Sequence, residues 1–255
     1  MNRYVALGSS MAGGPGIRPR AAGSPWAAGR SARNYAHLTA HELGLHLVDV
    51  TYSGATTAHV LRERQHGAQP QIEALDGTEA LVTVTIGGND VGYVPLLFAA
   101  TLPSVLRGMP VLGARLRELL DPAARDAALN QIGASLRDVG HALRERSPRA
   151  RIMFVDYVTL LPPPGIPAPP LPGDVADLGR HVAQRLAEET AAAAEATGCE
   201  IVPAADASRD HHAWSDEPWT LGAGSLLPWR PKPFHPNAAG MRAVADLVVA
   251  RFAQP

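Results

Sequence analysis

The stretch Ala80-Leu81-Val82-Thr83-Val84-Thr85-Ile86-Gly87-Gly88-Asn89-Asp90 decides the fold of this chain. Its first seven residues are apolar or β-branched nearly throughout, which is typical of a parallel strand that is buried on both faces. A glycine pair then ends the run, and two polar side chains follow. Because such a strand needs helices on both faces of its sheet, the stretch predicts an α/β protein.

Other short apolar runs alternate with longer helix-like segments along the chain. We expect strands at residues 4–7, 45–50, 80–86, 151–155 and 200–202. Helical periodicity marks residues 31–43, with Ser31 as N-cap and Gly44 as the stop, then 122–146, 174–196 and the segment that follows Asn237. This alternation favours a central parallel sheet covered by helices, in one domain that spans residues 1–255.

Two segments interrupt the alternation. Residues 161–173 are rich in proline and can form neither a helix nor a central strand, so we expect a stiff surface loop. Residues 206–234 carry few periodic cues. A long irregular segment in a compact domain is often functional, and this one leads directly into His235.

The composition is that of a globular protein with almost no net charge. Apolar residues make up 46% of the 255 residues and charged residues 18%, which excludes a disordered chain. The formal net charge is −1, so electrostatics indicate neither nucleic acid nor an anionic membrane as a partner. No apolar stretch reaches the length of a membrane span, so we expect no stable membrane insertion.

The sequence gives two weak indications of cellular location. Cys199 is the only cysteine, so no intrachain disulfide can form, which favours a reducing compartment. The N-terminal residues run directly into the first apolar run, without the basic and long apolar regions of a signal peptide. We therefore expect a cytoplasmic protein. A secreted protein whose leader has already been removed is the alternative.

Small or polar residues follow the first three predicted strands. Ser10 follows the first strand, Gly54 the second and Asn89 the third. In open α/β sheets ligands bind beyond the carboxyl ends of the strands, so we expect these residues to meet at one edge of the sheet. His235 arrives just before the last helix. A serine needs an imidazole to take its proton, and His235 is the residue that we expect to do so.

The same edge of the sheet offers donors for a developing oxyanion. These are the backbone N–H groups of Ser10 and Gly54 and the side-chain amide of Asn89. Glycine suits position 54 because it lets a substrate approach the backbone closely. Together with His235, these groups predict acyl transfer that needs no metal or organic cofactor.

Four segments resemble the motif blocks of the SGNH (GDSL-type) hydrolases. The nucleophile block is similar to Ala6-Leu7-Gly8-Ser9-Ser10-Met11-Ala12-Gly13-Gly14-Pro15-Gly16. The glycine block is similar to Ser53-Gly54-Ala55-Thr56, the Gly-x-Asn-Asp block to Gly87-Gly88-Asn89-Asp90 and the histidine block to Phe234-His235-Pro236-Asn237. They occur in the family's order and span nearly the whole chain. The resemblance, closest to the actinomycete lipase and esterase branch, implies a flavodoxin-like three-layer α/β/α sandwich. It also implies a serine esterase or lipase that works through an acyl-enzyme intermediate.

Two positions depart from the family pattern. Ser9 stands where the first block carries an aspartate, which should alter the support of the nucleophile more than its reactivity. Lys232 stands three residues before His235, where the family usually places the aspartate of its triad. A cationic side chain cannot accept the imidazole N–H. A backbone carbonyl from the turn 231–233 can be the partner instead, and we favour that of Lys232, which gives a Ser-His dyad. Asp210 or Asp216 from the long loop is the alternative third member.

Other interpretations of the same residues are weaker. The glycine-rich run after the first strand lacks dinucleotide spacing and the lysine of a phosphate loop, so we expect no nucleotide cofactor. His211 and His212 point in different directions in most backbones, so we expect no metal site there. The alternatives that remain are a phospholipase or a carbohydrate O-deacetylase on the same site, or a catalytically silent binding protein. The expected partner is a small-molecule or lipid ester, and the sequence leaves the oligomeric state open.

Overall fold

The computed structural model describes residues 2–103, 105, 109–224 and 232–254, and five strands of this part form one parallel sheet. The order across the sheet is β2-β1-β3-β4-β5. The strands are β1 (Arg3–Gly8), β2 (His46–Asp49), β3 (Glu79–Thr85), β4 (Arg151–Val155) and β5 (Glu200–Val202). This is the flavodoxin-like order, which confirms the predicted fold class.

Strand β3 lies at the centre of the sheet, as its composition predicts. It pairs in parallel with β1 on one side and β4 on the other, so that Val82 lies opposite Val5 and Ile152. Six of its seven residues are buried. Its β-branched side chains therefore pack against helices on both faces, which is the reason for the nearly continuous apolar run.

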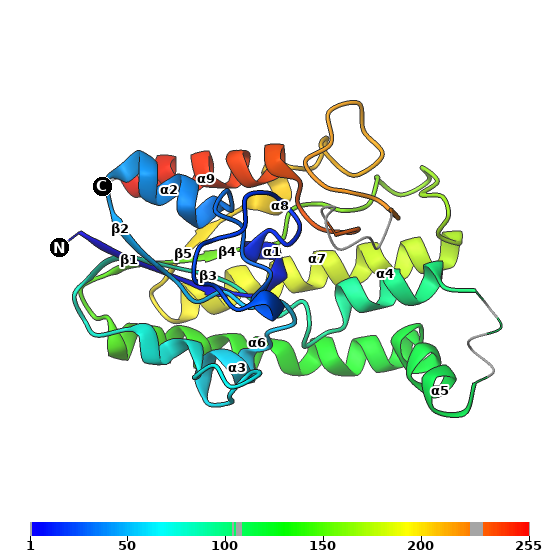
Figure 1. Ribbon diagram of the computed structural model, residues 1–255. Coiled ribbons are helices and arrows are strands. Elements are labelled where there is room, and N and C mark those ends of the chain that lie inside the picture. Colours follow the sequence, from blue (N-terminus) through cyan, green and yellow to red (C-terminus); the bar gives the residue numbers. More distant parts are fainter. Residues whose placement is uncertain (1, 104, 106–108, 225–231, 255) are drawn as a thin grey trace.

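Helices cover both faces of the sheet (Figure 1). On one face, α2 (Tyr35–Leu43) packs against α9 (Ala238–Ala253). On the other face, α6 (Pro122–Arg146) packs against α7 (Gly173–Ala196), with α3 (Thr57–Leu61), α4 (Tyr93–Thr101) and α5 (Pro110–Leu119) beside them. Two short helices, α1 (Ser10–Gly13) and α8 (Ala204–Ala207), lie just beyond β1 and β5. Two single-turn 3₁₀ helices cover Trp26–Ala28 and Gln71–Ala74.

Helix α2 begins later than the sequence pattern indicates. Its N-cap is Asn34, whose side chain accepts the N–H of His37 at 3.0 Å. Gly44 ends the helix with a left-handed φ of 63°, as predicted. The prediction of Ser31 as N-cap is wrong, because its hydroxyl accepts the N–H of Arg33 at 2.9 Å in a turn before the helix. Serine makes such local bonds in turns as readily as at helix starts.

The two irregular segments touch each other. Residues 161–172 form the predicted loop, with most of its prolines exposed, and Gly173 is already the first residue of α7. The indole Nε1 of Trp214, in the second segment, donates to the carbonyl of Pro169 at 3.1 Å. Residues 225–231 of that segment lie outside the described part. Within the described part of the chain, no helix combines the length and the apolar character that a bilayer span requires.

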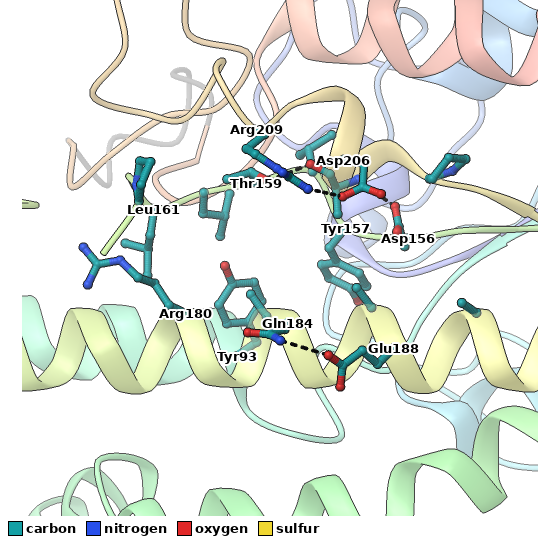
Figure 2. A pocket seen from close by; sticks show the side chains of 18 of the residues that line it. Tyr93, Asp156, Tyr157, Thr159, Leu161, Arg180, Gln184, Glu188, Asp206 and Arg209 are labelled. Atoms are coloured by element: carbon teal, nitrogen blue, oxygen red, sulfur yellow. Dashed lines mark hydrogen bonds and ion pairs between the residues drawn. The ribbon is translucent and has the colours of Figure 1, made fainter. Parts of the chain in front are cut away.

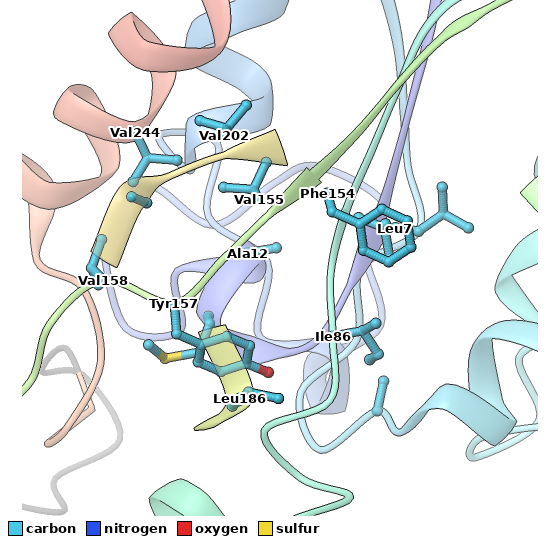
Figure 3. Close-up of a cluster of buried hydrophobic side chains, with 14 of the residues drawn as sticks. Leu7, Ala12, Ile86, Phe154, Val155, Tyr157, Val158, Leu186, Val202 and Val244 are labelled. Carbon is cyan, nitrogen blue, oxygen red and sulfur yellow. The ribbon is translucent and has the colours of Figure 1, made fainter. Parts of the chain in front are cut away.

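The apolar core holds the strand ends rigidly in place. Figure 3 shows Leu7 of β1, Phe154 of β4 and Val202 of β5 in one buried cluster, with Leu186 of α7 beneath and Val244 of α9 above. The chain leaves β1 toward α2 on one face but leaves β3 toward α6 on the other. Since β1 and β3 are neighbours, their connections diverge at the carboxyl edge of the sheet, which is the place where ligands bind in open α/β folds.

Candidate active site

Ser10 is the first residue of α1 and directly follows the tight turn at the end of β1. Gly8 has a φ of 136°, and a Cβ there would lie 2.4 Å from the carbonyl oxygen of Thr85. Only glycine therefore lets the ends of β1 and β3 come this close. Ser9 donates its N–H to the same oxygen at 2.9 Å. The side chain of Gln71 accepts the N–H of Gly8 at 2.7 Å and donates to its carbonyl at 3.0 Å. These bonds fix the position of the turn that carries Ser10.

His235 reaches Ser10 from the far end of the chain. Its Nε2 lies 2.8 Å from Oγ of Ser10, and its Nδ1 lies 2.7 Å from the carbonyl oxygen of Pro233. A carbonyl can only accept, so Nδ1 carries the ring hydrogen, and Nε2 of the neutral ring accepts from the serine hydroxyl. Both side chains are buried, Ser10 with 8% and His235 with 4% of its surface exposed.

The carbonyl that orients His235 belongs to Pro233, so the prediction of the Lys232 carbonyl is wrong by one residue. Phe234 between them has a left-handed φ of 55°, and this tight turn brings the carbonyl of Pro233 back to the ring. Lys232 donates its own N–H to the carbonyl of Pro15 at 3.2 Å, and its side chain is exposed.

No carboxylate takes the place of a third member. The side chains of Asp210 and Asp216 are exposed, while Nδ1 of His235 already donates to the carbonyl oxygen of Pro233. The residues outside the described ranges contain neither Asp nor Glu. Burial lowers the pKa of His235 to about 4; the bond to Pro233 raises it and the charge of Lys232 lowers it further, with no acidic group among the causes. The alternative of an aspartate from the long loop is therefore wrong.

Gly54 and Asn89 follow β2 and β3 as predicted, and bonds tie their loops together. The Asn89 amide donates to the carbonyl of Ala55 at 2.8 Å, which leaves its second N–H available. Gly54 has a φ of 80°, and among the described residues its N–H has no acceptor. Tyr52 donates its N–H to the carbonyl of Gly8 at 2.9 Å, which joins this loop to the turn that carries Ser10.

The backbone N–H of Ser10 is the third candidate donor. Ser10 is the first residue of α1, where an N–H has no partner within the helix, and the described residues offer it no acceptor. Asp90 supports the arrangement from behind. Its carboxylate accepts the N–H of Thr57 at 3.0 Å and the hydroxyl at 2.6 Å, and so holds the start of α3 near Asn89. Burial raises the pKa of Asp90.

Tyr157, just beyond β4, is a site residue that the sequence analysis missed. Its hydroxyl lies 3.1 Å from Oγ of Ser9 and accepts the N–H of Gly88 at 2.9 Å. The rule that polar residues at the carboxyl ends of parallel strands gather at the binding edge would also have indicated it. Asp156 and Tyr157 are the polar residues at the carboxyl end of the fourth strand.

A cavity of about 630 Å³ lies behind Tyr157, between α7 and the segment 156–164. Figure 2 shows Tyr93 and Tyr157 at its wall, Gln184 and Glu188 on α7, and Arg209 directed at Asp206. Neither Ser10 nor His235 lines it. Asp156 at its inner end accepts the N–H of Ala205 at 2.8 Å, and burial raises its pKa to about 7.

The adjacent histidines of the long loop serve its packing. The ring of His211 stacks on Trp219 with centroids 4.1 Å apart, and its Nδ1 bonds to the carbonyl of Glu217 at 2.8 Å. Nδ1 of His212 accepts the N–H of Trp214 at 3.2 Å. Within the described ranges, no group of three or more His, Cys, Asp or Glu side chains could hold a metal ion.

Comparisons with known proteins identify the family of this chain. Residues 6–243 match the GDSL-like lipase/acylhydrolase family. The chain is 32% identical to Lipase 2 of Streptomyces coelicolor over 250 residues, which cover 95% of this chain and 83% of the relative. It is also similar to the solved extracellular lipase of Streptomyces rimosus, with 26% identity, full coverage of both chains and a TM-score of 0.77.

The solved phospholipase A1 of Streptomyces albidoflavus shares the fold. It is 24% identical, 98% of each chain is covered, and the TM-score is 0.75. The family match spans most of the sequence, and it confirms the predicted family. The chain belongs to the GDSL-like lipase/acylhydrolase family and is a carboxylic ester hydrolase.

Proposed function

We propose that Ser10 and His235 form a catalytic dyad that cleaves carboxylic esters through an acyl-enzyme. One observation carries the proposal: His235 bridges the Ser10 hydroxyl, at 2.8 Å, and the backbone carbonyl of Pro233, at 2.7 Å. The carbonyl selects the ring tautomer that a general base needs, which is the role that an aspartate fills in a triad.

Acylation begins when Oγ of Ser10 attacks the ester carbonyl carbon and its proton passes to Nε2 of His235. The resulting imidazolium still donates from Nδ1 to Pro233. The tetrahedral intermediate collapses, the bond to the alcohol oxygen breaks, and Nε2 gives its proton to that oxygen. The alcohol leaves, and Ser10 carries the acyl group.

Deacylation repeats these steps with water. A water molecule attacks the acyl carbon while Nε2 of His235 takes one of its protons. The second tetrahedral intermediate expels Oγ of Ser10, which recovers the proton from Nε2. The carboxylic acid leaves, and the dyad returns to its starting state.

We assign the oxyanion hole to three donors: the N–H groups of Ser10 and Gly54 and the free amide hydrogen of Asn89. The described residues offer the two backbone groups no acceptor, so these donors are available to a developing charge. Preorganised donors of this kind stabilise the transition state without reorganisation during the reaction.

Small-molecule or lipid esters are the substrates that we propose. The 32% identical relative is named a lipase, which supports lipid esters. Next to His235, the ring of Phe234 packs edge-on against Phe98 of α4, with centroids 5.5 Å apart. Phe234 is fully buried, but Phe98 is partly exposed, so its ring offers an apolar surface near the base and supports an apolar group on at least one side of the scissile bond.

Covalent labelling and hydrolysis test the dyad. A fluorophosphonate should label the wild type at Ser10, and Ser10→Ala should abolish the label and lower kcat for p-nitrophenyl esters by about four orders of magnitude. His235→Ala should cause a similar loss. Ser215→Ala and His211→Ala are matched controls outside the site and should retain activity. A wild type that is inactive and unlabelled, or an active Ser10→Ala variant, would refute the proposal.

A further inference from the structure

We propose that Tyr157 is a positioning residue of this active site. Its hydroxyl joins the turn that carries Ser10 to the turn that carries Asn89. It thereby holds the nucleophile and the side-chain oxyanion donor in a fixed position relative to each other. The inference rests on the proposed dyad and names a group that neither touches the substrate nor moves a proton.

The two bonds of the Tyr157 hydroxyl are sheltered from solvent. Its oxygen lies 3.1 Å from Oγ of Ser9 and 2.9 Å from the backbone nitrogen of Gly88. Ser9 is 1% exposed and Tyr157 8% exposed. Figure 3 shows the ring within the apolar cluster, close to Leu186. Water is excluded there, so each bond constrains its partners strongly.

The donors and acceptors of this junction are matched. The phenol oxygen accepts the N–H of Gly88, and its hydrogen is then free to donate to Oγ of Ser9. Burial raises the pKa of Tyr157 to about 12, so the hydroxyl keeps its hydrogen wherever the enzyme works. A Cβ on Gly88 would lie 2.6 Å from the tyrosine ring, which shows how tightly the ring seats against this turn.

Each partner of Tyr157 directly precedes a residue of the proposed site. Ser9 precedes Ser10, and Gly88 precedes Asn89. Among the described residues, the N–H of Gly88 has no other acceptor. Without the hydroxyl this buried N–H would be unpaired, and the turn would shift to reach another partner. A shift of the Asn89 amide by a fraction of an ångström weakens its bond to the oxyanion more than it weakens substrate binding.

Serine at position 9 suits a phenol as its partner. Its short hydroxyl can make a neutral bond to a phenol without burying a charge, whereas a carboxylate at this place would have to be desolvated. Tyr157 and Ser9 therefore form one unit that links β1, β3 and β4 at their carboxyl ends.

Tyr93 supplies a matched control. Its ring contacts that of Tyr157, with centroids 6.4 Å apart and planes at 64°, and it lines the same cavity. Among the described residues its hydroxyl has no hydrogen-bond partner. Tyr93→Phe and Tyr157→Phe thus remove the same atom from neighbouring buried rings, but only the second removes bonds to the site.

The first experiment separates kcat from KM in these two variants, with active enzyme counted by fluorophosphonate titration. Tyr157→Phe should lower kcat by about 10- to 100-fold, in line with the cost of a small misplacement of reacting groups. KM should stay within about twofold, and the acid limb of the pH profile should not move, because His235 is untouched. Tyr93→Phe should match the wild type. Equal kcat in the wild type and Tyr157→Phe would overturn the proposal.

The second experiment is a double-mutant cycle with Ser9→Ala. The single change should lower kcat less than Tyr157→Phe does, because Gly88 keeps its acceptor. The double variant should be no slower than Tyr157→Phe alone, since both changes break one unit. If the fold-loss of kcat in the double variant equals the product of the two single losses, the two residues act separately and the proposal is overturned. A wild type without label at Ser10 would instead refute the dyad, so the two failures are distinguishable.

Discussion

At the scale of single residues, the unusual feature is a histidine oriented by a neutral partner. The carbonyl of Pro233 fixes the tautomer of His235 as a carboxylate would, but it carries no charge to stabilise the imidazolium. Burial and the cation of Lys232 then lower the pKa of the ring to about 4. The base is therefore weak but remains neutral in mildly acidic solution.

The pH dependence of kcat/KM should show this directly. A general base must be neutral to act, so activity should rise with pH through the pKa of His235 in the free enzyme. The acid limb should fall near pH 4, well below the value of about 6.5 for an unperturbed histidine. Initial rates with a p-nitrophenyl ester in a constant-ionic-strength buffer series will locate it. An acid limb between pH 6 and 7 would contradict the neutral-partner arrangement.

Removing the charge of Lys232 should move that limb. The lysine cation lowers the pKa of His235, so Lys232→Met should raise the pKa and shift the acid limb to higher pH. The turnover at neutral pH should be retained, because the backbone carbonyl of Pro233 is unchanged. Lys232→Arg keeps the charge and is the matched control. If both variants shift equally, the lysine acts through something other than its charge.

At the scale of elements, the sequence predicts regular structure well and side-chain partnerships poorly. Apolar runs locate β4 and β5, and periodicity locates α6, because burial imposes these patterns directly. The carbonyl of Pro233 was missed by one residue because the left-handed φ of Phe234 leaves no mark in a non-glycine sequence. The role of Tyr157 depends on a contact between residues 69 positions apart, which no local pattern encodes.

The four elements of the site follow a simpler rule. Each predicted residue lies at the carboxyl end of a strand or the start of the last helix, where the topology alone gathers it. That is why Ser10, Gly54, Asn89 and His235 could be named together from sequence. The third member could not, because a backbone carbonyl is present at every position and only the local turn selects one.

The start of α9 should be sensitive to Asn237, which follows His235 by two residues. Its Oδ1 accepts the N–H of Gly240 at 2.9 Å as the N-cap, and its Nδ2 donates to the carbonyl of Pro218 at 2.5 Å. Asn237→Ala loses both bonds and should lower the free energy of unfolding by about 1–3 kcal/mol. Urea denaturation measures this.

Asn237→Asp is the matched control for that change. Aspartate keeps an oxygen for the cap but cannot donate to Pro218. A loss smaller than in Asn237→Ala is expected, and the difference between the variants isolates the cap. Equal losses would mean that the bond to the long loop, rather than the cap, holds the start of α9.

At the scale of the whole molecule, the fold joins residues 225 positions apart in one hydrogen bond. This bond buries an imidazole, while the carboxyl end of β4 buries Asp156. Both groups resist ionisation in the folded state, with opposite consequences for stability. The pKa of His235 falls to about 4, and that of Asp156 rises to about 7.

The signs of these two contributions follow from proton binding. Between pH 4 and 6.5 the unfolded chain binds more protons at His235, so this group makes stability rise with pH, by about 3 kcal/mol in all. Between pH 4 and 7 the folded chain binds more protons at Asp156, so that group makes stability fall with pH, by about 4 kcal/mol. The two slopes oppose each other, and the wild type should show little net change from this pair.

Asp156→Asn should reveal the pH dependence of stability that comes from His235. Asparagine keeps an oxygen for the N–H of Ala205 but does not titrate, so the variant loses the falling contribution and keeps the rising one. Measured by urea denaturation, its stability relative to the wild type should increase from pH 4 to pH 7 by about 4 kcal/mol. His235→Gln should show the opposite trend, a relative decrease of about 3 kcal/mol over the same interval. All other titrating groups are common to the three proteins and cancel in these differences. If both differences are flat, the burial of an imidazole and a carboxyl group does not govern the acid stability of this fold.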